Sequence, residues 1–192
     1  MCLFCMALQY DTIKTVRSKI KIIDEDLLHR IAQGDMEALR CLYDIAGYAV
    51  FGFALSMLKN KQDAEDILQD TFLKIRSAAH LYQPRGTPMA WILTMTRNFC
   101  LMKLREKQKN QAIEEKMMEN TMLYVQDNTN RVVLEAAFSI LTDEERRIIM
   151  LHVLSGLKHR EIAQILELPL STVLSKNNRA LKKLKQYLQK GD

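Results

Sequence analysis

Few side chains in this chain have the type and spacing that reaction chemistry needs. Cys2 and Cys5 form a Cys-x-x-Cys pair, which is a spacing found in zinc and redox sites. No second such pair follows, and the four histidines are scattered. A Ser/His/Asp order and a glycine-rich phosphate loop are also missing from the sequence. We therefore expect no enzyme, no metal or other cofactor, and no small-molecule substrate.

Side chains suited to phosphate binding gather at the C-terminal end instead. From Lys158 to Asp192, eight lysines and arginines stand against three acids, so this segment alone equals the net charge of +5 of the whole chain. A basic block at one end is typical of nucleic acid binding. Without an accompanying motif, a solvated lysine-rich terminal helix would be the default interpretation.

Residues 159–178 supply such a motif, because they fit a helix-turn-helix. Ala163 is small where the two helices would cross, and Glu-Leu-Pro makes a three-residue turn before a long basic helix from Leu170 to about Gln189. The pattern predicts a DNA-binding domain, with a plain basic helical hairpin as the alternative. The candidate DNA-binding residues on the second helix are Ser171, Thr172, Ser175, Lys176, Asn178, Arg179 and Lys182.

Helical periodicity runs through the rest of the chain, and only three prolines and six glycines interrupt it. This composition favours an all-α fold of two small helical domains joined by a linker. The expected divisions are an N-terminal extension at 1–21, a first domain at 22–106, a polar linker at 107–130, and a second domain at 131–192 that contains the helix-turn-helix.

Several helix boundaries follow from capping rules. One helix should end at Gly34, Asp35 should cap the next, and Asp63 should start another. Thr142 and Glu145 form a capping box in the second domain. In the first domain, the helix from Pro88 to about Glu106 should bury one side that carries Trp91, Met95 and Met102.

The sequence does not predict a membrane span. The longest mostly apolar stretch, Ile45 to Leu58, has 14 residues, whereas a spanning helix needs roughly 20. The N-terminal MCLFCMAL has no basic region before it and no cleavage site after it. We expect a cytoplasmic protein with reduced cysteines.

Three segments resemble a known family. GLKHREIAQILELPLSTVLSKNNRALKKL (156–184), together with the preceding LTDEERRIIMLHVLSG, resembles the fourth conserved region of extracytoplasmic-function sigma factors. KNKQDAEDILQDTFLKI (59–75) looks like the polymerase-binding segment of that family. PRGTPMAWILTMTRNFCLMKLR (84–105) is similar to the segment that melts and reads the minus-ten element.

The resemblance implies a protein that binds core RNA polymerase and promoter DNA and directs transcription initiation. The first domain would recognise the minus-ten element and the second the minus-thirty-five element. An anti-sigma factor, commonly membrane-bound in this family, is a further implied partner. The resemblance assigns polymerase binding to Asp63, Asp66, Gln69, Asp70 and Phe72, and handling of the non-template strand to Arg97, Asn98, Lys103 and Arg105.

Two other functions compete with this one. A stand-alone helix-turn-helix regulator would bind DNA without polymerase, and segment 59–75 is the feature against it. An interaction protein that never touches DNA is disfavoured by the basic helix at the C-terminal end. On the residues alone, a solvated helix face is the preferred interpretation of the acids of segment 59–75.

This chain also departs from the family pattern. Glu167 occupies a turn position where glycine is usual, and Leu174 and Leu181 replace residues that are commonly basic. Asn177 stands on the expected inner face, where a leucine normally packs. Either the helix is rotated so that these leucines meet something else, or they are exposed and the promoter preference has changed. A protein contact, to an anti-sigma factor or to the first domain, is one hypothesis for the leucines.

Overall fold

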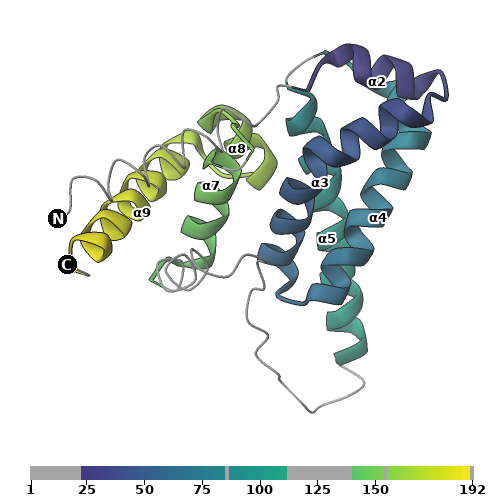
Figure 1. Cartoon of the computed structure of the whole chain (residues 1–192). Helices are drawn as coiled ribbons and strands as arrows, with labels where there is room; N and C mark the ends of the chain where they lie inside the picture. The colour runs from purple at the N-terminus through teal and green to yellow at the C-terminus, as the bar shows by residue number, and fades with distance from the viewer. Residues whose placement is uncertain (1–22, 85–86, 112–139, 154, 191–192) are drawn as a thin grey trace. The chain divides into compact units, whose positions relative to one another are not determined.

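The structure is a computed structural model that describes residues 23–84, 87–111, 140–153 and 155–190. In these ranges the regular elements are all helices, and the helices fall into two compact units, which confirms the predicted all-α class (Figure 1). We call them the N-terminal unit (helices between residues 23 and 111) and the C-terminal unit (helices between 140 and 190). The N-terminal extension with Cys2 and Cys5 lies outside the described residues.

The N-terminal unit is a bundle in which α3, α4 and α5 lie side by side (Figure 1). Its elements are α2 (Glu25–Ala32), α3 (Met36–Leu58), α4 (Lys61–Ala78), the short 3₁₀ helix η1 (Ala79–Leu81) and α5 (Pro88–Gln111).

Two of the predicted helix ends are confirmed. Gly34 adopts a φ of +91°, a conformation that glycine reaches without a steric penalty. Asp35 caps α3, since its carboxylate accepts hydrogen bonds from the amides of Glu37 (2.9 Å) and Ala38 (3.0 Å). The start of α4 was predicted two residues late: Asn60 is the cap and accepts from the amide of Asp63 at 3.0 Å.

Helix α3 provides the core of the N-terminal unit. Leu42, Val50, Phe53 and Ala54 are at most 1% exposed, and α3 packs against α2, α4 and α5. Among the described helices, α3 alone is long and apolar enough to cross a membrane, and 56% of its most apolar window is buried inside the bundle. That burial is what a core helix of a folded unit shows.

Helix α5 differs from its prediction in phase and in length. Met102, expected on the buried side, is 62% exposed, whereas the buried residues are Met89, Ile92, Leu93, Thr96 and Cys100. Apolar residues lie all around this helix, so periodicity did not single out the side that meets α3 and α4. The helix also continues to Gln111, which makes the first five residues of the predicted linker helical.

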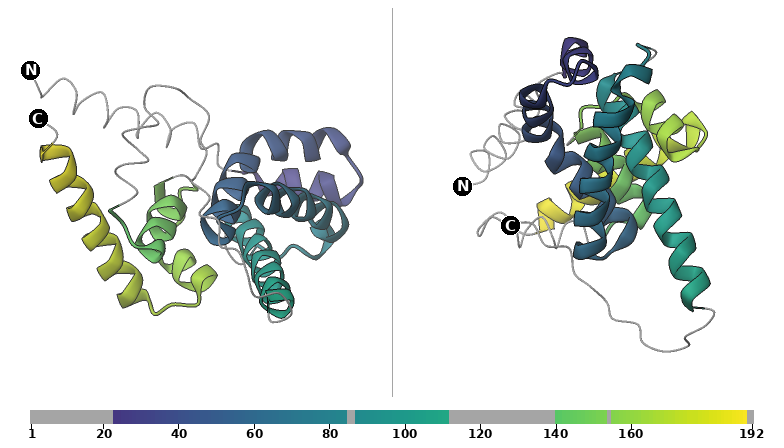
Figure 2. Two further views of the ribbon diagram at one scale, coloured as in Figure 1. Left: turned by 90° about the horizontal axis from the view of Figure 1, so that it is seen from below. Right: turned by 90° about the vertical axis from the view of Figure 1, so that its right-hand side faces the viewer.

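The C-terminal unit contains α7 (Asp143–Val153), α8 (His159–Leu166) and α9 (Leu170–Lys190). The two views of Figure 2 show α9 as a long helix with α7 packed against its side. The predicted capping box is confirmed, because the Thr142 amide donates to Glu145 Oε2 (2.9 Å) and the Glu145 amide donates to Thr142 Oγ1 (3.3 Å). The predicted extent of the basic helix agrees with α9 within one residue.

Candidate functional site

One side of α4 carries three exposed polar side chains followed by an exposed leucine. Asp66, Gln69 and Asp70 are exposed, and Leu73 is 62% exposed. Residues three, four and seven apart lie on the same side of a helix, so these four side chains form one surface, which we call the acidic face. Sequence analysis did not include Leu73, although its seven-residue spacing from Asp66 was a usable signal.

Phe72, assigned to polymerase binding by resemblance, lies in the core instead. Its side chain is 7% exposed, and its ring centroid is 4.9 Å from that of Tyr43 on α3. One residue along a helix turns the side chain by about 100°, so Phe72 points inward while Leu73 points outward. In this structure, therefore, Phe72 packs α4 against α3, and Leu73 is the apolar residue exposed on the acidic face.

Asp63, from the same set, is also removed from the surface. It is 9% exposed and forms ion pairs with Lys107 and with Lys103 (3.7 Å), both from α5. Lys103 lies 3.8 Å from Asp66 as well. Lys103, which sequence analysis assigned to DNA, thus joins α5 to α4 in the free chain.

The remaining strand-handling candidates fall into two groups on α5. Asn98 and Arg105 are exposed, and their seven-residue spacing puts them on the same side of the helix as the exposed Met102. Arg97 is half-buried and lies on a different side. The structure therefore brings Asn98 and Arg105 together, and separates them from Arg97 and Lys103.

The side of α9 that is buried in the structure is the side that the sequence predicted to face inward. Val173 and Ala180 are fully buried, Asn177 is 5% exposed, and Leu184 packs against the cluster formed by Leu141, Ile149 and Ala180. A rotated helix is therefore excluded. Leu174 and Leu181 are accordingly exposed, by 41% and 47%.

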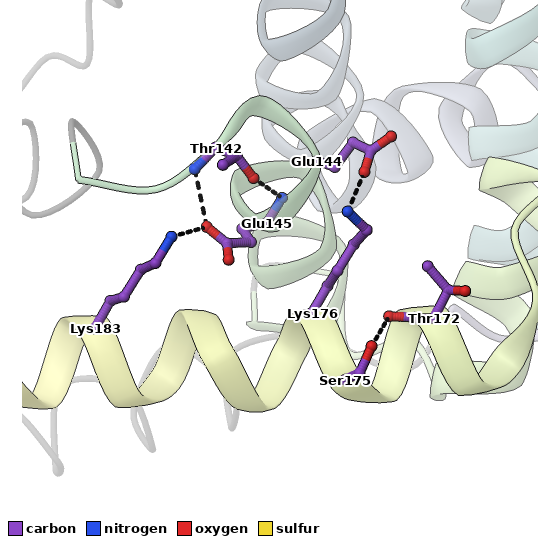
Figure 3. A network of polar contacts seen from close by, with 7 residues as sticks. All are labelled: Thr142, Glu144, Glu145, Thr172, Ser175, Lys176 and Lys183. Atoms are coloured by element: carbon purple, nitrogen blue, oxygen red, sulfur yellow. Dashed lines mark hydrogen bonds and ion pairs between the residues drawn. The ribbon is translucent and has the colours of Figure 1, made fainter.

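The outer side of α9 holds most of the DNA-binding candidates. Exposed are Ser171, Ser175, Asn178, Arg179 and Lys182, which we call the outer face. Thr172 is half-buried, and its carbonyl accepts a hydrogen bond from Ser175 Oγ at 3.0 Å (Figure 3).

Two lysines of α9 reach back to the start of α7 instead (Figure 3). Lys176 Nζ lies 2.5 Å from Glu144 Oε2, and the Lys176 side chain is only 24% exposed. Lys183 Nζ donates to Glu145 Oε2 at 2.7 Å. Lys176 was predicted to bind DNA, but in this structure it pairs with α7, and the Lys183 contact was not predicted at all.

Glu145 is the buried centre of this network. Its side chain is 4% exposed and accepts from both Thr142 and Lys183. Burial opposes ionisation, but the Lys183 ammonium and the Thr142 amide outweigh it and lower the pKa of Glu145 below its ordinary value. A buried charge with a complete set of partners stabilises the junction of α7 and α9 only while each partner is present.

The turn of the helix-turn-helix accommodates its non-glycine residue. Glu167 adopts a φ of +54°, and the Leu168 amide donates to the Ala163 carbonyl at 3.0 Å to end α8. This positive φ is the conformation that makes glycine usual at the position. A residue with a side chain pays about 1 kcal/mol for that conformation.

Two histidines stack next to the helix-turn-helix core. The ring centroids of His152 and His159 are 4.5 Å apart, and burial together with His152 lowers the pKa of His159. His159 Nε2 and Asn177 Oδ1 are buried atoms without a hydrogen-bond partner among the described residues. No group of three or more potential metal ligands occurs in the described ranges.

Comparison with known proteins identifies the family. The model of sigma-70 region 2 matches residues 42–110, and that of sigma-70 region 4 matches residues 131–184. The ECF RNA polymerase sigma factor SigK of Mycobacterium ulcerans (strain Agy99) is 28% identical, over 84% of this chain and 91% of its own length. The ECF RNA polymerase sigma factor SigX of Bacillus subtilis (strain 168) is 24% identical, over 80% of this chain and 84% of its own.

Solved structures support the same fold. The sigma factor RpoE of Bartonella quintana, crystallised with the anti-sigma factor NepR, aligns with a TM-score of 0.65 at 21% identity, over 78% of this chain and 96% of RpoE. CnrH, solved with the cytosolic domain of CnrY, aligns with a TM-score of 0.59 at 22% identity, over 88% and 99%. With both conserved sigma regions in one chain, and relatives that match nearly its whole length, this protein belongs to the extracytoplasmic-function sigma factors, cytoplasmic transcription initiation factors that bind core RNA polymerase and direct it to promoters.

Proposed function

We propose that the acidic face of α4 is the polymerase-docking surface and that the outer face of α9 reads the minus-thirty-five duplex. The observation that carries this proposal is that some polar side chains of these two helices stay exposed while others are held inside their unit. Gln69 and Asp70 are exposed, and Asp66 is exposed although Lys103 lies 3.8 Å away, whereas Asp63 is buried. Likewise, Arg179 and Lys182 are exposed, whereas Lys176 and Lys183 pair with α7.

The acidic face fits a basic protein surface with an apolar depression. Leu73 supplies the side chain that gains most from leaving water, and Asp66 and Asp70 beside it complement cations on the partner. Gln69 adds a hydrogen-bonding amide. The alternative, a solvated acidic face, does not account for a leucine that is 62% exposed at the C-terminal end of the face.

On α5, Asn98 and Arg105 are the best placed groups for the melted minus-ten strand. An exposed amide can hydrogen-bond to the edges of an unstacked base, and a guanidinium on the same side of the helix can hold the backbone phosphate. Lys103 acts indirectly in this proposal, because it fixes α5 to the acidic residues of α4.

We also propose an anti-sigma factor as a regulatory partner, held at the membrane in the manner that the family resemblance implies. Its support is that RpoE and CnrH, which share this fold, were solved in complex with the anti-sigma factor NepR and with the cytosolic domain of CnrY, respectively. A partner that covers the acidic face would block polymerase by occupying the same residues.

Run-off transcription tests the proposed function. Core polymerase from the bacterium that carries this chain is combined with promoter fragments from the same genome, with and without the protein. Discrete transcripts should depend on the chain and should be lost with Asp66→Ala plus Gln69→Ala.

Lys61→Ala is the control. Lys61 is exposed on another side of α4, where it pairs with Glu65 at 3.7 Å, and its loss should leave transcription unchanged. If the chain bound the fragments tightly alone and core polymerase stayed inactive, the protein would be a stand-alone regulator instead.

A further inference from the structure

Leu174 is an exposed apolar side chain on a part of α9 that is otherwise polar. It is 41% exposed, and it lies between Ser171, three residues before it, and Asn178, four residues after it. Both neighbours are exposed members of the outer face. The helical spacing therefore places Leu174 at the border of the outer face, where a DNA-facing helix presents its side chains to the groove.

Its position along the helix separates Leu174 from the other exposed leucine. Leu174 is the fifth residue of α9, and the N-terminal residues of a recognition helix are those that reach base edges. Leu181 has a similar exposure, 47%, and lies on the same side, but seven residues further on, at about 10 Å along the axis.

The chemistry of the major groove restricts what a leucine can meet there. Base edges present hydrogen-bond donors and acceptors, which a leucine cannot satisfy, and one apolar group, the 5-methyl of thymine. A lysine or arginine at this position would instead favour guanine. A leucine pressed against a base other than thymine would leave polar atoms without partners.

We propose that Leu174 contacts the methyl group of a thymine in the minus-thirty-five element and so determines that base. The inference rests on the proposed function, in which the outer face of α9 reads the duplex. It assigns this chain a promoter specificity at the position where it departs from the basic residues that are common in its family.

The first experiment selects promoters with the complete holoenzyme. Core polymerase with the wild-type chain, or with Leu174→Ala, Leu174→Arg or Leu181→Ala, selects from fragments whose minus-thirty-five element is randomised. The wild type should select a thymine that Leu174→Ala no longer distinguishes and that Leu174→Arg replaces with guanine. Leu181→Ala should keep the wild-type preference.

The second experiment removes only the methyl group. Each thymine of the selected element is replaced in turn by uracil, and holoenzyme binding is measured with the wild type and with Leu174→Ala. One replacement should weaken wild-type binding about fourfold, which is the factor for burial of one carbon group, about 0.8 kcal/mol. The same replacement should leave Leu174→Ala unaffected.

The outcomes separate this inference from the function on which it rests. If no uracil weakens wild-type binding, or if Leu174→Ala is weakened equally, Leu174 does not read thymine, and its exposure is then explained by a protein contact. If the holoenzyme selects no minus-thirty-five sequence at all, the outer face of α9 does not read the duplex, and both the proposed function of α9 and this inference are wrong. Unchanged thermal unfolding and polymerase affinity of each variant show that the substitutions act only at the DNA.

Discussion

Helices α4 and α9 are built alike but carry exposed side chains of opposite charge. Each follows a tight turn through a residue with positive φ, Lys59 before α4 and Glu167 before α9. Each buries one side and leaves a leucine exposed on another, Leu73 and Leu174. The leucines differ in the faces on which they lie, which carry Asp66 and Asp70 on α4 and hydroxyl, amide and basic groups on α9.

On both helices, helix packing leaves only some of the charged residues exposed and therefore available to bind a partner. Of the acids on α4, Asp63 is buried and paired with lysines of α5, whereas Asp70 is exposed and Asp66 stays exposed despite its contact with Lys103. Of the cations on α9, Lys176 and Lys183 pair with α7, and Arg179 and Lys182 remain exposed. Residues paired inside a unit should affect stability, and exposed residues should affect binding.

The largest expected effect is on stability. Glu145→Ala removes the side-chain half of the capping box of α7 and leaves Lys183 without its partner, so it should lower the free energy of unfolding of the C-terminal unit by about 2 kcal/mol. Hydrogen exchange of the α7 amides in the whole chain measures this. Glu144→Ala, which breaks the more exposed ion pair to Lys176, should cost less than about 0.5 kcal/mol, and equal losses would contradict the comparison.

The next effect is on polymerase binding. Leu73→Ala should weaken the affinity for core polymerase by about tenfold, because it removes the exposed apolar side chain of the acidic face. A titration of labelled protein with core polymerase measures the affinity. Leu81→Ala truncates a leucine of nearly the same exposure, 64%, on η1, and should change it by less than about twofold. Equal effects would place the docking surface elsewhere.

The turns before α4 and α9 both contain a non-glycine residue with positive φ, and the energetic cost of that conformation can be measured. Glu167→Gly should raise the free energy of unfolding of the C-terminal unit by about 0.5–1 kcal/mol, since glycine adopts the observed φ of +54° without strain. Lys59→Gly, at a φ of +55°, should do the same for the N-terminal unit. Chemical denaturation followed separately in each unit tests both, and a loss of stability in either would show that the side chain contributes more than its strain costs.

A smaller effect is expected on the salt dependence of promoter binding. Lys182→Ala should reduce the slope of log affinity against log salt by about one, because one phosphate contact is lost. The neighbouring Lys183→Ala should leave the slope unchanged and lower stability instead, because Lys183 is already paired with Glu145. Promoter binding by the holoenzyme is measured for both variants at several salt concentrations. If Lys183→Ala lowered the slope and Lys182→Ala did not, Lys183 and not Lys182 would contact phosphate.

The smallest effect concerns pH. Burial and the adjacent His152 lower the pKa of His159 in the folded chain, so the unfolded chain takes up a proton first as the pH falls below about 6.5. The C-terminal unit should therefore lose stability between neutral pH and the lowered folded pKa, and regain it as the pH rises. Thermal unfolding across that range measures the loss, which His159→Gln should reduce. An unchanged profile would show that His159 titrates normally.

The sequence by itself determined the features that depend on local rules. The all-α class, the caps at Asp35 and Thr142, and the inner face of α9 with Asn177 all follow from the spacing of side chains within one helix or turn. The positive φ at Glu167 follows in the same way from the turn of the motif. The family followed from three segments whose order along the chain is itself sequence information.

Only the tertiary structure decided which of the candidate residues are free to bind. Lys107 lies 44 residues from Asp63, and Lys183 lies 38 residues from Glu145, so each pair meets only because two helices pack together. The same packing turned Phe72 inward and left Leu73 exposed. Residue type and spacing indicate which side chains could bind a partner. Packing against neighbouring helices then excludes some of these side chains, because a charge that is already paired inside a unit gains little free energy from an external partner.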